Sequence, residues 1–381
     1  MPNFLVVGRA ASALYFPIDD CFLVRAFPSP FGRVDVLFQT RRSTTNGVEQ
    51  PLPRGLWVEV CGHAPSLMDA LTAFPQIAQN LTAVLTITAN APTEDIVPEL
   101  GIDITDGVTE RAFFQQFLFD ERLLPFTRPV FPVKQAETIL SLLANHADSD
   151  RLHRAMAQYD AALRYWYLGG EVMALGHLYM GMEAMTPVVI RQLLAKGSIT
   201  NRDELAAAWG VEAKRLDSEA RRRLLFEGDD VTYTRAKKAS DGFEHGFLPF
   251  QSIREHAIAT KNTTARYLRK SILTYLGLGS QEVDTLSSPP FAEIPTLRVD
   301  KYIFGTLTGT APNPAAPDQM YPILQWKSTP TGLSIGPDGT STITFTETIT
   351  PKLAEGIAFT PARFEVWGGP GVKPANVNSG G

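Results

Sequence analysis

The first 130 residues alternate short apolar runs with Pro, Gly and polar residues, a pattern typical of β-strands. It predicts strands at residues 4–7, 21–24, 34–39, 57–60, 102–104 and 112–118. Residues 66–88 have the period of a helix instead. Pro75 predicts a break in that helix, because proline lacks the N–H that a helix interior needs. We therefore expect residues 1–130 to form a mixed, β-rich module.

The pattern becomes helical from about residue 132 to residue 276. Asp148 or Ser149 is a suitable N-cap for a long helix that ends at the Gly169-Gly170 pair. The next helix carries apolar residues three or four positions apart, namely Val172, Leu175, Tyr179, Met182 and Val189. Further helices are predicted at 135–145, 202–210, 218–226, 231–243 and 250–276. Several such helices predict an all-α bundle over residues 131–278.

The last hundred residues return to a strand pattern. Residues 287–290, Ser-Ser-Pro-Pro, are typical of a linker. Threonine alternates with other residues over 340–350, and Gly336-Pro337-Asp338-Gly339 predicts a hairpin turn that joins this strand to one at 333–335. Another strand is expected at 361–367, before a frayed tail. Residues 279–381 are thus expected to be a C-terminal β-rich module, either a small sandwich or an added sheet. The fold class predicted for the whole chain is multidomain α+β.

Composition narrows the class of protein. A chain of 381 residues with 44% hydrophobic residues is long enough for two or three domains. The net charge of -5 means that any site for nucleic acid must be local. Cys21 and Cys61 lie in apolar runs and are expected to be unpaired. The N-terminus lacks the features of a secretory signal, and no apolar run is long enough to cross a membrane. We expect a soluble cytoplasmic protein with no membrane partner.

The histidines and cysteines offer no spacing that predicts a metal site. Neither His-x-x-x-His nor Cys-x-x-Cys occurs, and the chain has no Gly-x-Ser-x-Gly nucleophile motif. We therefore expect no metal and no cofactor. His177 lies in the most apolar helix and is expected to be a hydrogen-bonded core residue.

His245 differs because of its basic surroundings. Residues 214–238 contain eight basic and five acidic side chains, and His245 follows at the predicted end of a helix. Such a cluster could hold a phosphate backbone, with the histidine moving a proton beside it. It could equally be a solvated helix surface, on which the basic side chains pair with the acidic residues Asp217, Glu219, Asp229 and Asp230. The sequence leaves both interpretations open.

Two blocks of the helical region resemble the Apea-like branch of the HEPN superfamily. The first runs from Ala162 to Tyr167 and then from Ala174 to Met185, with an acidic residue on an apolar stripe. The second is Ala239-Ser240-Asp241-Gly242-Phe243-Glu244-His245-Gly246, placed where HEPN proteins carry a final Arg-Asn-x-x-x-His motif. The resemblance covers about residues 149–277. It implies a central HEPN-like helical bundle that forms a homodimer.

The resemblance also implies a function directed at RNA or a nucleotide. Many HEPN proteins are metal-independent endoribonucleases in which the RNA 2′-hydroxyl attacks its own phosphate, often in defence or stress response. Here the implied catalytic residues are His245, Glu244, Lys238 and Arg235, and the implied RNA-binding residues are Arg221, Arg222, Lys237 and Arg254.

The chain departs from the family motif at the position of its arginine. Ser240 stands five residues before His245, where the motif has Arg, and Asp241 stands where Asn is usual. Either the site is rebuilt from Lys238 or Arg235, or from Arg254 if the fold brings it back, or the site is degenerate. In the second case the protein is a catalytically inactive, dimerising interaction or structural protein.

Overall fold

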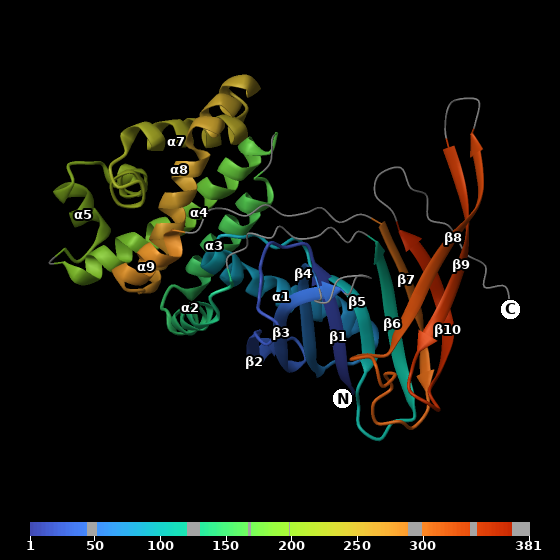
Figure 1. Ribbon diagram of the computed structural model, residues 1–381. Helices are drawn as coiled ribbons and strands as arrows, with labels where there is room; N and C mark the ends of the chain where they lie inside the picture. Colours follow the sequence, from blue (N-terminus) through green and yellow to red (C-terminus); the bar gives the residue numbers. More distant parts are fainter. Residues whose placement is uncertain are drawn as a thin grey trace.

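The computed structural model describes residues 1–43, 52–119, 130–166, 169–197, 199–288, 299–335 and 341–367. The protein has a mixed α+β fold, as the sequence predicts, with a large antiparallel sheet at one side and a group of helices at the other (Figure 1). Both cysteines are free and half-buried. Among the described residues, no helix is both long enough and apolar enough to cross a membrane.

The six strands of the first predicted module all form. They are β1 (Asn3–Ala10), β2 (Phe22–Ser29), β3 (Gly32–Ser43), β4 (Leu52–His63), β5 (Val97–Asp103) and β6 (Glu110–Phe119). They belong to an eight-stranded sheet with the order β10-β7-β6-β5-β1-β4-β3-β2. Alternate side chains of β3 and β4 are buried, as the period-two pattern of these strands requires.

Two C-terminal strands complete this sheet. β7 (Val299–Thr308) pairs with β6 along its whole length, and β10 (Ala358–Trp367) pairs with β7 at the sheet edge. The N- and C-terminal modules that the sequence predicts therefore share one sheet. A strand pattern shows which face is apolar but does not name the neighbouring strand, so this pairing across the helical region could not be foreseen.

The predicted C-terminal hairpin is confirmed. β8 (Ile323–Ile335) and β9 (Ser341–Lys352) pair antiparallel, with Ile335 opposite Ser341. The predicted turn at Gly336–Gly339 lies outside the described residues, as do Pro289 and Pro290 of the predicted linker and the predicted tail. This hairpin forms a separate two-stranded sheet beside β7 and β10 (Figure 1).

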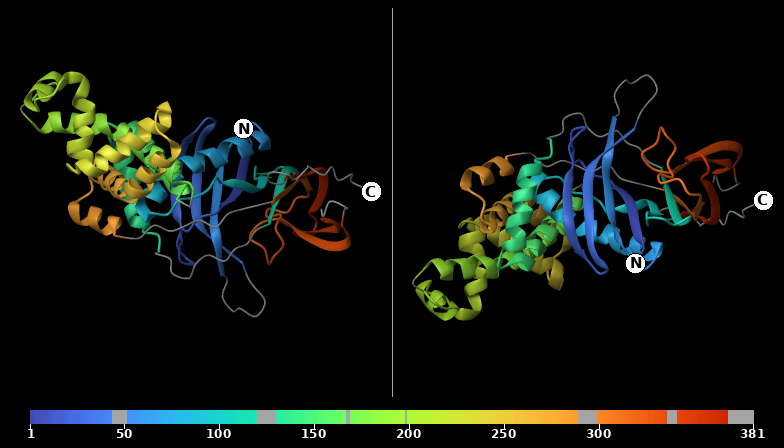
Figure 2. Two further views of the ribbon diagram at one scale, coloured as in Figure 1. Left: turned by 90° about the horizontal axis from the view of Figure 1, so that it is seen from above. Right: turned by 90° about the horizontal axis from the view of Figure 1, so that it is seen from below.

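Helix α1 (Leu67–Ala89) lies across one face of the large sheet (Figure 2). Ser66 caps it by accepting a hydrogen bond from the Asp69 N–H. The break predicted at Pro75 is wrong, since the helix continues through it. Pro75 is itself buried, and α1 contributes residues to two cores, one against the sheet and one against the helices. Packing on both sides therefore outweighs the hydrogen bond that proline removes.

The remaining helices gather on the other side of α1. They are α2 (Val133–Asn145), α3 (Ser149–Arg164), α4 (Glu171–Lys196), α5 (Arg202–Ala208), α6 (Leu216–Ala220), α7 (Asp230–His245), α8 (Phe250–Leu276) and α9 (Ser280–Ser287). They share one hydrophobic core, in which the predicted α4 stripe from Val172 to Val189 is buried. Asp148, one of the two predicted N-caps, occupies that position on α3 but makes no side-chain capping hydrogen bond, whereas the Asn201 side chain caps α5 by accepting from the Glu204 N–H. α5 lies at the end of the molecule away from the sheet (Figures 1 and 2).

Candidate functional site

His245 is the last residue of α7 and is exposed to solvent. Gly246 ends the helix with φ 65°, and its N–H donates to the Gly242 carbonyl. The imidazole ring stacks on exposed Phe247, with 6.5 Å between ring centroids. The corner between α7 and α8 stands out from the helical region in Figure 1. His245 is therefore accessible to a ligand and is not a structural core residue.

Ser240 and Glu244 interact with each other on α7. Ser240 is 1% exposed, and its Oγ donates to Glu244 Oε1 at 3.0 Å. An arginine side chain at position 240 would have to displace core side chains. A guanidinium group near His245 must therefore come from another position, and Ser240 orients the Glu244 carboxylate.

Three basic residues precede His245 on α7. Lys237 forms an ion pair with Asp241 one helical turn later, so its charge is largely balanced. Lys238 and Arg235 are exposed, and neither makes an ion pair within the described part of the chain. Lys238, Asp241 and His245 are spaced by three and four residues, which places them along one face of the helix. Lys238 and Arg235 are the predicted catalytic cations that remain open to an anion.

The four predicted RNA-binding residues all have carboxylate partners. Their ion pairs are Arg221 with Glu183 (3.5 Å), Arg222 with Glu219 and Asp230 (each 2.6 Å), Arg254 with Glu171 (3.5 Å) and Lys237 with Asp241. Acidic neighbours therefore offset much of the positive charge expected from the sequence. These four residues match the solvated, paired helix surface more closely than an open phosphate-binding cluster.

Glu219 gives a prediction about pH that tests these ion pairs. Hydrogen bonds from Arg222 hold the pKa of Glu219 at about 2, below its ordinary value of 4.5. A carboxyl group whose pKa is lower in the folded than in the unfolded protein stabilises the fold. This stabilisation is present above the ordinary pKa and is lost as the pH falls toward 2. We expect Glu219→Gln to lower the free energy of unfolding at neutral pH by about 1–2 kcal/mol.

Urea unfolding between about pH 2 and pH 7 measures this effect. The difference between Glu219→Gln and the wild type should shrink as the pH falls through the acidic range. Glu227→Gln is the control, because Glu227 pairs with Lys270 at an exposed site and should contribute less than about 1 kcal/mol. An equal effect of the two substitutions at every pH would contradict the prediction.

Arg221 contacts the first of the two blocks that resemble HEPN proteins. It begins a π-helical turn, Arg221–Leu225, and its guanidinium reaches α4, where it lies over the Tyr179 ring at 5.6 Å and beside Glu183 at 3.5 Å. Tyr179 and Glu183 belong to the first block. Asp241 of the second block lies close enough to Tyr179 to influence its pKa. A guanidinium, a carboxylate and a phenol therefore meet on α4, with Asp241 of α7 in the neighbourhood of the phenol.

This cluster has unused hydrogen-bonding capacity. The Tyr179 Oη and the Arg221 Nε atoms are buried without a hydrogen-bond partner among the described residues. Burial raises the pKa of Tyr179, so its phenol is protonated at neutral pH. Unpaired buried polar atoms are uncommon in native structures, so these two atoms call for an explanation such as a bound group or a catalytic role. The sequence pattern gave no sign of the contact between Arg221 and α4, because only the fold brings the two together.

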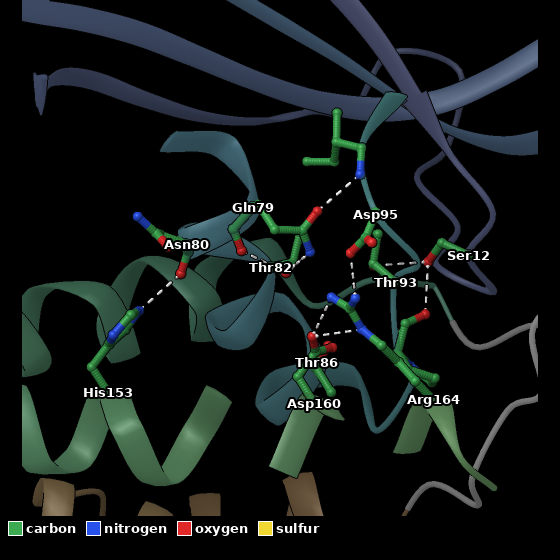
Figure 3. Close-up of polar contacts among 12 residues, drawn as sticks. Ser12, Gln79, Asn80, Thr82, Thr86, Thr93, Asp95, His153, Asp160 and Arg164 are labelled. Carbon is green, nitrogen blue, oxygen red and sulfur yellow. Dashed lines mark hydrogen bonds and ion pairs between the residues drawn. The ribbon is translucent and has the colours of Figure 1, made fainter. Parts of the chain in front are cut away.

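A polar network connects α3 with α1 and with the loop before β5 (Figure 3). Arg164 donates to Asp160 at 2.8 Å and to Asp95 at 2.6 Å, and Thr86 of α1 donates to Asp160. His153 of α3 also bonds the Asn80 carbonyl of α1. Figure 3 shows that these side chains come from α1, α3 and the loop before β5, so the network fixes the helical region against α1.

A cleft of about 490 Å³ lies beside this network, lined in part by Glu94, Arg164, Tyr165 and His177. The expectation that His177 is a core residue is wrong. Its Nδ1–H donates to Gln158 at 2.8 Å, as expected of a hydrogen-bonded histidine, but its ring is only half-buried and stacks on Tyr165. Burial lowers the pKa of His177 and raises that of Glu94. The cleft thus holds a neutral imidazole and a carboxylate, groups that can exchange a proton with a ligand.

No group of three His, Cys, Asp or Glu side chains suited to a metal ion occurs among the described residues. Comparisons of the chain with protein-family models, with curated proteins and with solved structures found no match.

Proposed function

We propose that this chain is an RNA-directed protein of the HEPN type, whose helices over residues 149–277 form a HEPN-like bundle. The observation that supports this most is the packing of α4 against α7, since it brings Tyr179 of the first block near Asp241 of the second. His245 lies one helical turn beyond Asp241. In this proposal exposed Lys238 supplies the positive charge that the family motif draws from an arginine at position 240.

The chemistry proposed is metal-independent cleavage of single-stranded RNA. The 2′-oxygen forms a bond to the neighbouring phosphorus while the bond from phosphorus to the 5′-oxygen breaks, which gives a cyclic phosphate and a 5′-hydroxyl. His245 moves a proton at these oxygens, and exposed Lys238 stabilises the negative charge that develops on the phosphorane. Arg235 extends the positive surface along α7 toward the flanking phosphates.

The exposed surroundings of His245 support a site shared between two copies. Phe243, Phe247 and Phe250 are 44%, 60% and 62% exposed and lie within five residues of His245 in the chain, where α7 gives way to α8, and Phe247 stacks on the histidine ring. Large exposed apolar side chains grouped in this way are typical of association surfaces. A homodimer formed here would cover these rings and bring two His245 side chains together, as the HEPN resemblance implies.

The test is cleavage of a mixed pool of labelled single-stranded and structured RNA in EDTA. We expect the wild type to cleave and His245→Ala to lose at least about 100-fold in rate, the usual contribution of a general acid or base. His63→Ala is the matched control, because His63 is also exposed but lies on β4 of the sheet. Equal rates for His245→Ala and the wild type would reject the catalytic role of His245.

A second function is favoured by the ion pairs described above. Because four basic side chains are already paired and Ser240 replaces an arginine, the same helices could serve as an inactive, dimerising interaction module. Absence of cleavage by the wild type, together with no RNA retention at low salt, would favour this alternative. Retention that weakens steeply with added salt would instead indicate RNA binding without cleavage.

A further inference from the structure

A second cavity lies on the opposite side of the C-terminal end of α3 from the cleft at His177. It has a volume of about 360 Å³ and is lined by residues of α3, α8, the end of α9 and Asn90, the C-cap of α1. None of its lining residues is acidic, whereas two of them, Arg266 and Arg269, are arginines. The size is at the lower end of the range for small-molecule sites.

Arg269 is a fixed positive charge in the wall of this cavity. It is 3% exposed, and its Nε and Nη2 atoms donate to the carbonyls of Ile87 and Thr88 in the last turn of α1, each at 2.9 Å. Burial lowers the pKa of Arg269. The effect that raises this pKa comes from the Tyr159 hydroxyl and not from a carboxylate. A buried guanidinium without a lining carboxylate favours an anionic partner.

The other side of the cavity supplies further donors. Arg266 is one helical turn from Arg269 on α8 and is held over the Tyr267 ring at 5.4 Å. The Ser287 Oγ of α9 is buried and has no hydrogen-bond partner among the described residues. Two arginines of α8 and a serine of α9 whose hydroxyl has an unused donor therefore line the same cavity. Guanidinium groups bind phosphate and carboxylate oxygens through paired hydrogen bonds.

We propose that this cavity binds a small molecule through a phosphate or carboxylate group held by Arg266, Arg269 and Ser287. The bound group completes the hydrogen bonding of the Ser287 hydroxyl and balances the charge of Arg269. Because the lining comes from α1, α3, α8 and α9, the ligand stabilises the junction between the sheet and the helices. This site uses none of the residues proposed for RNA cleavage and does not depend on that function.

The test is calorimetric titration of the full-length protein with pyrophosphate and, separately, with citrate, at constant ionic strength. We expect saturable binding of at least one of them. The comparison of the two affinities shows whether the site prefers a phosphate or a carboxylate group. Arg266→Ala should weaken that binding at least about tenfold, because one of the two charge-assisted contacts is lost. Arg266 is exposed, so this variant should retain the fold.

Lys134→Ala is the matched control, because Lys134 is an exposed cation on α2 that lines neither this cavity nor the site proposed for RNA. Its anion binding should equal that of the wild type. Binding that is kept at full strength in Arg266→Ala would overturn the proposal, as would no binding of either probe at about 10 mM, a concentration that even a weak specific site would respond to.

Discussion

A chain that ends at Ser288 is expected to aggregate, although it retains the whole of the first two modules predicted from the sequence. Without β7 and β10, the β6 edge of the large sheet is left open, and unpaired edges promote association between chains. The result would show that the N- and C-terminal parts of the chain form one folding unit.

The truncation also removes one hydrophobic core. Ile303, Leu307 and Leu324 are each at most 3% exposed, and they cover a cluster on β5 and β6 that includes Phe113 and Phe117. Burial of three such side chains contributes about 5 kcal/mol or more. The Gln115 side chain also exchanges two hydrogen bonds with the Leu324 backbone, at 2.8 and 3.1 Å. Loss of these contacts leaves Gln115 buried without its partners.

Soluble yield and size-exclusion chromatography measure this outcome. The control is a chain that ends at Trp367, which keeps β7, β8, β9 and β10 and should be soluble and monodisperse. If the chain ending at Ser288 were soluble and unfolded cooperatively at the same temperature as the control, the shared sheet would not be needed for stability. The three modules would then be independent, as the sequence pattern alone predicts.

Local patterns in the sequence predicted the elements of this fold better than their arrangement. Short apolar runs identified β1 to β6, and apolar residues three or four positions apart identified helices such as α4, because both signals depend on near neighbours in the chain. The pairing of β6 with β7 depends on residues about 190 positions apart. The wrong break at Pro75 has a similar origin, since the packing on both sides of α1 cannot be seen in a local window.

The candidate site shows the same limit. The sequence placed His245 at a helix end and identified the basic residues before it, and both observations agree with the structure. The count of charges could not show that Arg222 pairs with Glu219 and Arg254 with Glu171, because these ion pairs depend on side-chain geometry. The chain positions of Arg269 and Ser287 also gave no signal of the cavity that they share.

Asp160→Ala is expected to destabilise the protein by about 3–5 kcal/mol, the usual effect of removing one partner of a buried ion pair. The Asp160 side chain is 7% exposed and accepts hydrogen bonds from Thr86 and Arg164. Burial raises its pKa, an effect that Arg164 opposes. The substitution leaves the Thr86 hydroxyl and part of the Arg164 guanidinium without partners at the junction shown in Figure 3.

Asp95→Ala is the matched control, because Asp95 pairs with the same arginine at 2.6 Å but is 85% exposed. It should lower the free energy of unfolding by less than about 1 kcal/mol, since solvent screens an exposed pair. Urea unfolding of both variants gives the comparison. Similar small losses would mean that the junction draws its stability from apolar packing of α1 against the helices. A large loss in the free energy of unfolding that is confined to Asp160→Ala would instead show that the buried Asp160 carboxylate holds the helices to α1.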